Sequence, residues 1–453
     1  MPGSGEDCSS SSSSSASAPT GSRRITEGPD RIPIDDYHRF IRIFRKRAYP
    51  VWPVINCDEL LSKLQTNDCD YESWALGAAL CAATIAQLRL PEHVEGENHL
   101  ASSSRFVKDC LRFRDLYDFR ESYSLASILT PFFLHMYYAN ADKLRTAAYF
   151  LREAITFMQG MELGLPETYA HLDKRERSLR LRIYWIMVVT ERTFSAQNGL
   201  PVVLPTISTL PDIDESGEES HLMHAFMTLT RLFSYLDGNI TESSSSPSGL
   251  QPLERQKLAS YQADLCFDSH GTASDEAQRV DLFVTRQWIR LLVWEYTARH
   301  FAMSCYPEDP AFSLFLPVKI GHEMLSTFSQ VNNEAIKPHG YGMELKVFRL
   351  ADAMLDIVQC APWSARGDGM LVGSGDILYS LQCVLLDVGG KKSTFLNKMQ
   401  DRMTQLELNS GSWPYLAIPS PSDSSRSSPP SSKASGSPKD HVFCGPRIEE
   451  VDW

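Results

Sequence analysis

The segment RLRIYWIMVVTERTFSAQNGLPVVLP, from Arg180 to Pro205, gives the clearest indication of how this chain folds. Its middle, Ile183–Val189, is an unbroken apolar run that is too short to span a membrane. Apolar residues in and around this run recur at steps of three and four, which predicts a helix. A helix that is apolar on nearly every side must be buried, so we expect it in the middle of a helical core. Gly199 and Pro201 should end the helix, and the extended segment Pro201–Pro211 should follow.

Four residues of this segment stand out as a candidate regulatory or packing motif. Tyr184 and Trp185 lie within the apolar run, and Glu191 and Arg192 follow it directly. Glu191 and Arg192 can form a buried ion pair that supports the core, or they can contribute to an effector site. We favour the structural role.

Helical periodicity continues on both sides of the central segment. At least six helices are expected up to Asn198, one of them capped by Asp70, and no alternating strand pattern occurs. Ser122–Ala141 contains no charged residue, but its polar groups argue against a membrane span. We expect it to form a buried helix that is broken at Thr130–Pro131. Later helices are predicted over Val280–Met303, His322–Val331, Leu345–Val358, Ile377–Val388 and Ser393–Leu408.

These patterns predict an all-α protein: one large irregular helical domain flanked by disordered Ser/Pro-rich termini. Serine-rich segments poor in apolar residues cannot offset the entropy of ordering, so they should be disordered. We expect a disordered N-terminus (1–30), a core helical domain (31–235), a Ser-rich linker and variable segment (236–279), a C-terminal helical part of the same domain (280–408) and a disordered tail (409–453).

A basic cluster, Arg45-Lys46-Arg47, ends the first predicted helix, whose apolar stripe includes Tyr37 and Phe44. One hypothesis is a nuclear-import or phosphate-binding cluster. The alternative is a solvated helix face whose basic residues suit the negative end of the helix dipole, and we favour this reading.

Composition limits the classes of function. The 453 residues carry a formal net charge of −12, which argues against nucleic-acid binding by the whole chain, since phosphate binding needs concentrated Lys and Arg. The ten cysteines are scattered without a CxxC pair, as expected for reduced thiols in an intracellular protein.

The sequence lacks the common motifs of catalytic sites. Gly389–Ser393 lacks the first glycine of a phosphate-binding loop, and no GxSxG or DDxxD motif occurs. His221 and His224 have no carboxylate or thiol nearby at ligand spacing. We therefore predict that the chain is not an enzyme and that it has no catalytic, cofactor-binding or metal-binding residues.

Several segments together resemble a known family. The central run from Tyr184, the preceding YFLREAITFMQGMELGLPETY (Tyr149–Tyr169), AYPVWPVI (Ala48–Ile55) and ALGAALCAATIAQLRL (Ala75–Leu90) are similar to the middle homology region of fungal zinc-cluster (Zn2Cys6) transcription factors. This region is the fungal-specific transcription factor domain, and the likeness is to the maltose- and starch-utilisation activators. It covers Ile34–Leu210 and fades afterwards.

The resemblance implies a nuclear transcription regulator of a sugar-utilisation or secondary-metabolite gene set. It also implies a helical domain that gates activation, a small-metabolite effector, a homodimer and no contact with membranes. Partners would be the transcription machinery or a DNA-binding partner protein. The competing hypothesis is a helical interaction scaffold without a direct transcriptional role.

The family's zinc cluster is the point of departure. Such a cluster needs six cysteines within about thirty residues to surround two metal ions, whereas Cys8 is the one cysteine before Ile34. Two explanations remain open: the DNA-binding module was lost, or the gene model starts too late. Zinc is expected as a cofactor only if such an N-terminal module is missing from this sequence.

Overall fold

The computed structural model describes residues 32–91, 101–121, 123–211, 220–236, 240, 253–266, 275–360, 368–391 and 393–410. The chain divides into two compact units, Met1–Asn409 and Ser410–Trp453, and the architecture below is that of the first. No β-strand occurs in the described residues, where one isolated bridge joins Ser304 and Ser313. The all-α prediction is therefore confirmed. The predicted disordered N-terminus (1–30) and the tail from residue 411 onwards lie outside the described residues, whereas residues 409 and 410 of the predicted tail end α16.

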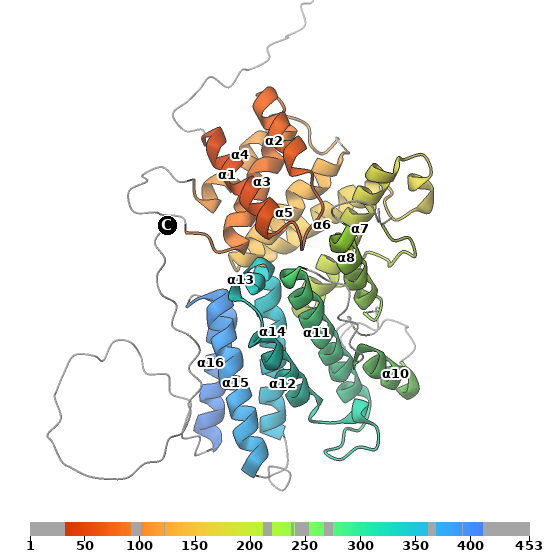
Figure 1. Ribbon diagram of the computed structural model, residues 1–453, viewed down its shortest axis with the longest axis vertical. Helices are drawn as coiled ribbons and strands as arrows, with labels where there is room; N and C mark the ends of the chain where they lie inside the picture. Colours follow the sequence, from red (N-terminus) through yellow and green to blue (C-terminus); the bar gives the residue numbers. More distant parts are fainter. Residues whose placement is uncertain are drawn as a thin grey trace, which may run out of the picture. The chain divides into compact units, whose positions relative to one another are not determined.

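The N-terminal helices pack around α3 and α5 (Figure 1). Helix α3 contacts α1, α4 and α5, and α5 also contacts α6. Side chains at the helix starts accept backbone N–H groups that would otherwise lack partners, as Asp70 does from Ser73 N at 3.1 Å. The elements are α1 (Ile34–Arg47), α2 (Cys57–Thr66), α3 (Tyr71–Gln87), α4 (Ser103–Arg114), α5 (Leu125–Asn140), α6 (Leu144–Gly160), the 3-10 helix η1 (Pro166–Tyr169) and α7 (Lys174–Asn198).

Helix α7 is the predicted central helix. Asp173 caps its start by accepting the backbone N–H of Glu176 at 2.9 Å. Gly199 ends it with a left-handed backbone (φ 62°), a conformation that glycine adopts without steric cost. Ile183–Val188 is buried throughout, so the expected burial of the apolar run is confirmed over those residues.

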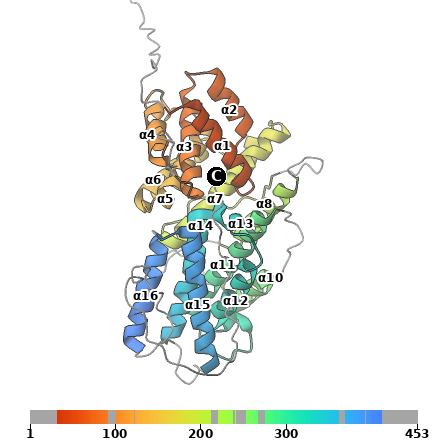
Figure 2. The ribbon, with the colours of Figure 1, turned by 60° about the vertical axis from the view of Figure 1, so that its left-hand side comes forward.

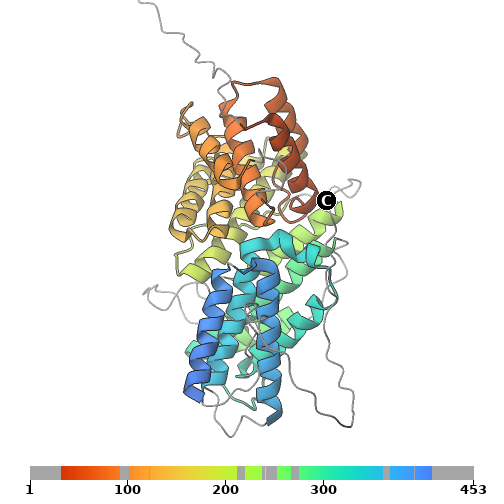
Figure 3. The same ribbon diagram turned by 90° about the vertical axis from the view of Figure 1, so that its left-hand side faces the viewer.

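The later helices form the second part of the unit, and α12, α14, α15 and α16 run side by side in Figures 2 and 3. Arg402 of α16 is held against α14 by Asp352 and Asp356. These elements are α8 (Ser220–Phe233), α10 (Arg255–Cys266), α11 (Glu276–His300), η2 (Pro310–Phe312), α12 (Leu316–Phe328), α13 (Asn333–Ile336), η3 (Lys337–His339), α14 (Gly340–Cys360), α15 (Asp368–Gly389) and α16 (Thr394–Ser410).

One local prediction fails. Helix α5 runs through Pro131 without the expected break. A proline inside a helix costs about 3 kcal/mol, and the burial of its neighbours Phe132, Phe133 and Leu134 offsets that cost. The segment expected to be linker and variable also contributes structure, because its residues 255–266 form α10 against α11. None of the described helices has the length and apolar character needed to cross a membrane.

Candidate functional site

The central helix holds the chain segment that follows it. We call this extended segment, Pro201–Thr209, the strap. The Tyr184 hydroxyl donates a hydrogen bond to Pro205 O at 2.8 Å, and Trp185 Nε1 donates to Thr209 O at 2.9 Å. Burial raises the pKa of Tyr184 to about 12, so its hydroxyl keeps the proton it donates at neutral pH. Two aromatic residues of the candidate motif thus bind strap carbonyls.

Glu191 binds the strap from two turns further along α7. Its carboxylate is fully buried and accepts the backbone N–H groups of Val203 at 2.8 Å and Leu204 at 2.9 Å. The same carboxylate accepts Nη1 of Arg152 on α6 at 2.5 Å, and Arg152 also donates to Pro201 O. A buried charge is tolerated when it is paired and hydrogen-bonded, and Glu191 is both.

Arg192 completes the contacts. Its guanidinium donates to Leu204 O at 2.9 Å and to Leu236 O, beyond α8, at 3.2 Å. Tyr184 and Glu191 are seven residues apart, as are Trp185 and Arg192, so each pair repeats after two helical turns and shares a face of α7. The structure therefore brings all four motif residues together in a packing role, and a regulatory role for them stays a prediction.

The basic cluster lies on the last turn of α1 and takes part in the fold. Arg45 Nη1 lies 2.5 Å from Asp58 Oδ1, and Arg47 Nη2 lies 2.5 Å from Glu334 Oε2 on α13. Lys46 is exposed. The cluster is thus an ordered helix end with two of its three side chains in ion pairs, and its role in nuclear import stays a prediction.

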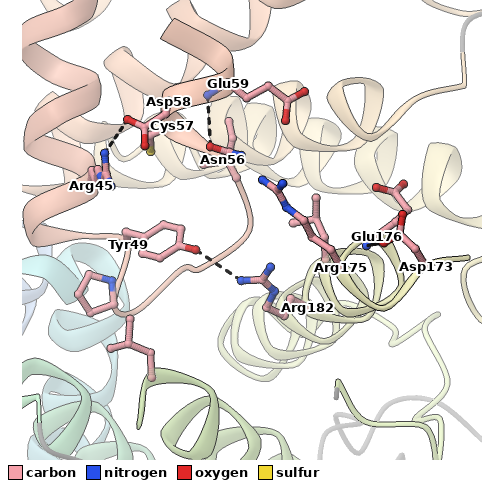
Figure 4. A pocket seen from close by; sticks show the side chains of 14 residues that line it. Arg45, Tyr49, Asn56, Cys57, Asp58, Glu59, Asp173, Arg175, Glu176 and Arg182 are labelled. Carbon is pink, nitrogen blue, oxygen red and sulfur yellow. Dashed lines mark hydrogen bonds and ion pairs between the residues drawn. The ribbon is translucent and has the colours of Figure 1, made fainter. Parts of the chain in front are cut away.

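A cleft of about 690 Å³ opens beside the basic cluster (Figure 4). It lies between the α1–α2 connection on one side and the first half of α7 on the other, and Leu222 of α8 also borders it. Its polar lining comes from Arg45, Tyr49, Asn56, Asp58, Glu59, Asp173, Arg175, Glu176 and Arg182, and its apolar lining from Pro50, Ile55, Leu179 and Leu222.

Charges of both signs line this cleft, which we call the α2–α7 cleft. Arg182 Nη1 donates to the Tyr49 hydroxyl at 3.5 Å, across the opening. The Arg175 guanidinium points into the same space in Figure 4. The sequence prediction missed this site. Arg175 and Arg182 are seven residues apart and share a face of α7, but Arg175 precedes the segment singled out in the sequence, Arg180–Pro205.

Further cavities occur in the described part of the chain. One of about 110 Å³ lies among α5, α7, α11 and α14, and His135, Asp281 and Lys346 border it. Another of about 710 Å³ lies between α11 and α12, where Glu323 accepts Arg290 Nη1 at 2.6 Å. The described residues contain no group of three or more His, Cys, Asp or Glu side chains placed to bind a metal ion.

Comparison with known proteins finds a family model that matches part of this helical core. Residues 41–248 match the family model described as the fungal specific transcription factor domain. That range includes most of the N-terminal helices, the strap and the basic cluster.

Curated relatives extend the similarity beyond this domain. A probable sucrose utilization protein of Candida albicans is 23% identical over 337 residues, which are 72% of this chain and 65% of the relative. A maltose fermentation regulatory protein of Saccharomyces cerevisiae is 24% identical over 72% of this chain and 69% of its own length. A respiratory transcription factor of Saccharomyces cerevisiae is 24% identical over 74% of this chain and 72% of its own length. The chain thus spans about two thirds of the curated relatives it matches.

Proposed function

We propose that the chain, part of which matches the fungal specific transcription factor domain, regulates the transcription of metabolic genes, and of genes for sugar use in particular. The match of residues 41–248 to that domain carries this proposal. The printed names of the relatives support the metabolic assignment, since they describe sucrose utilisation, maltose fermentation and respiration. The protein would act in the nucleus through the transcription machinery or a DNA-binding partner protein.

The helical core supports a regulatory rather than a catalytic role. Glu191 and Arg192 of the central helix bind strap backbone: Glu191 accepts Val203 N and Leu204 N, and Arg192 donates to Leu204 O. Helix α7 thus fixes the position of the strap that follows it. Such fixed placement suits a regulatory domain, because it determines which surfaces the neighbouring segments of the chain can contact. A small-metabolite effector and a homodimer belong to this proposal as further predictions.

A tethering experiment tests the proposal without assuming how the chain reaches DNA. The full chain is fused to an unrelated DNA-binding domain and placed at a reporter gene in a fungal host. We expect reporter transcription to change with the carbon source, relative to the DNA-binding domain alone. A reporter whose binding site is mutated serves as the control.

Two outcomes contradict the proposal. One is an unchanged reporter on every carbon source, together with an unchanged transcriptome when the gene is deleted in its own host. The other is proximity labelling that recovers signalling or cytoskeletal proteins and no transcription machinery, which would favour the scaffold hypothesis.

A further inference from the structure

We propose that the α2–α7 cleft binds a small anionic metabolite, with Arg175 and Arg182 contacting its carboxylate or phosphate group. The inference rests on the small-metabolite effector of the proposed function and names its chemical class and site. Binding to the purified chain tests it separately from any effect on transcription. The cleft volume of about 690 Å³ lies within the roughly 300–1,000 Å³ typical of small-molecule sites.

The acidic residues around the cleft already have partners within the protein. Asp58 pairs with Arg45 at 2.5 Å, and Glu59 pairs with Lys63 at 3.0 Å. Four carboxylates and three arginines line the cleft. Lys63 and Arg180, which do not line it, pair with two of these carboxylates. The other two carboxylates are engaged as well: Glu176 accepts Arg180 Nε at 2.8 Å, and Asp173 caps α7.

Arg175 and Arg182 bring hydrogen-bond donors to the cleft. Among the described residues, Arg175 has no ion-pair partner, and its guanidinium points into the cleft in Figure 4. Arg182 reaches into the same space from two turns further along α7 and contacts the Tyr49 hydroxyl. Guanidinium groups present several N–H donors in a plane, which matches the oxygen pairs of carboxylates and phosphates. Donors in excess predict a ligand rich in acceptors.

The rest of the lining fits such a ligand. The start of α2 borders the cleft at Asn56 and Cys57, where helix dipoles favour negative charge. Asn56 caps α2 with its side-chain oxygen, accepting Glu59 N at 3.2 Å, and its amide nitrogen is a further donor. Leu179 and Ile55 provide an apolar surface for a carbon skeleton. The ligand is thus a phosphorylated or carboxylated metabolite rather than a bare ion.

Calorimetric titration of the purified full chain tests this inference. The probes are glucose 6-phosphate and citrate, with glucose and maltose as neutral counterparts at equal ionic strength. We expect at least one anionic probe to bind and the neutral sugars to bind at least tenfold more weakly. Charge-assisted hydrogen bonds contribute about 1.5–3 kcal/mol, so Arg175→Gln should weaken anion binding about 10- to 100-fold.

A matched variant separates local binding from general attraction. Lys174 is exposed, precedes Arg175 on α7 and does not line the cleft, so Lys174→Gln should leave the dissociation constant within about twofold. Arg175 is itself exposed, so its replacement should leave the circular dichroism spectrum unchanged. The inference is overturned if neither anion binds, if the neutral sugars bind as well as the anions, or if Arg175→Gln and Lys174→Gln have equal effects.

Discussion

The N-terminal helices and the later helices stabilise their interiors in different ways. In the first part, one apolar cluster runs from Ile32 to Phe226, and aromatic rings meet edge to face within it, as Tyr37 and Phe106 do at 5.1 Å. In the second part, α11 and α14 carry charges into the interior. There, Lys346 Nζ lies 3.3 Å from Asp281 Oδ1 and 2.6 Å from Thr285 Oγ1.

This difference determines which substitutions each part tolerates. Apolar burial is non-directional, so its contribution falls with the area and volume that are removed. A buried ion pair contributes little net stability, yet removing one partner leaves an uncompensated charge in a low-dielectric interior. The aromatic cluster around Phe106 should therefore respond to lost volume, and the Asp281–Lys346 contact between α11 and α14 to lost charge balance.

Truncating a core ring should have the largest effect. Phe106 is fully buried between Tyr37 and Phe40, so Phe106→Ala should lower the free energy of unfolding by about 3–5 kcal/mol. Urea denaturation followed by circular dichroism measures this loss. Phe106→Leu, which keeps most of the volume, should cost clearly less. Equal losses for the two variants would show that volume is not what matters at this position.

Removing one charge from the later helices should have an effect of similar or slightly smaller size. Lys346→Met leaves the largely buried carboxylate of Asp281, whose side chain is 14% exposed, with His339 as a basic neighbour 3.9 Å away. The substitution should cost about 3–5 kcal/mol. Burial alone would raise the pKa of Asp281, but Lys346 and His339 hold it below its usual value. The same urea denaturation measures the change.

The double variant makes this test specific. Asp281→Leu combined with Lys346→Met removes both charges, so most of the lost stability should return. Lys319→Met, at an exposed position on α12, should change stability by less than about 0.5 kcal/mol. A double variant that is less stable than Lys346→Met alone would contradict the view that charge imbalance causes the loss.

The same contrast explains what could be predicted from the sequence. Burial of Ile183–Val188, the Asp70 cap and the Gly199 terminus follow from local spacing and local chemistry, and all are found. The predicted helix break at Pro131 was wrong, because tertiary packing outweighs the low helix propensity of proline. The Asp281–Lys346 contact joins residues far apart in the chain, which no periodic pattern reports.

The candidate site shows the same limit. Tyr184, Trp185, Glu191 and Arg192 could be singled out because polar groups beside an apolar run need partners. Their common partner could not be identified, because an extended strap has no periodicity of its own. The α2–α7 cleft was missed for a related reason: its walls come from two helices that only the tertiary fold brings together.

Loosening the strap should have a smaller effect than the core substitutions. Glu191→Gln keeps the size of the side chain but removes the negative charge that pairs with Arg152. It also replaces one of the two oxygens that accept hydrogen bonds from Val203 N and Leu204 N. A loss of about 2 kcal/mol is expected, because hydrogen bonds to charged groups contribute about 1.5–3 kcal/mol. Hydrogen exchange should accelerate most at the amides of Val203 and Leu204.

Glu167 on η1 is exposed, so Glu167→Gln provides a control for this experiment. It should leave strap exchange unchanged. Uniformly faster exchange throughout the chain in Glu191→Gln would indicate global destabilisation instead of local release of the strap.

Neutralising the basic cluster should have the smallest effect on stability. Replacing Arg45, Lys46 and Arg47 together by Gln removes two ion pairs, one of which, Arg47 to Glu334, joins α1 to α13. Surface ion pairs contribute about 0–1 kcal/mol each, because water screens the charges and side-chain entropy opposes the contact. The loss measured in urea should therefore stay below about 2 kcal/mol, well under that of Lys346→Met.

A change in location would then report on import and not on folding. If the cluster directs nuclear import, a fluorescently tagged triple variant should remain outside the nucleus in living cells while its stability is almost unchanged. Replacing the exposed residues Arg145, Lys174 and Lys398 by Gln removes the same charge elsewhere and should leave the location as it was. An unaltered nuclear signal in the cluster variant would assign these residues to the solvated end of α1, where basic side chains already suit the helix dipole.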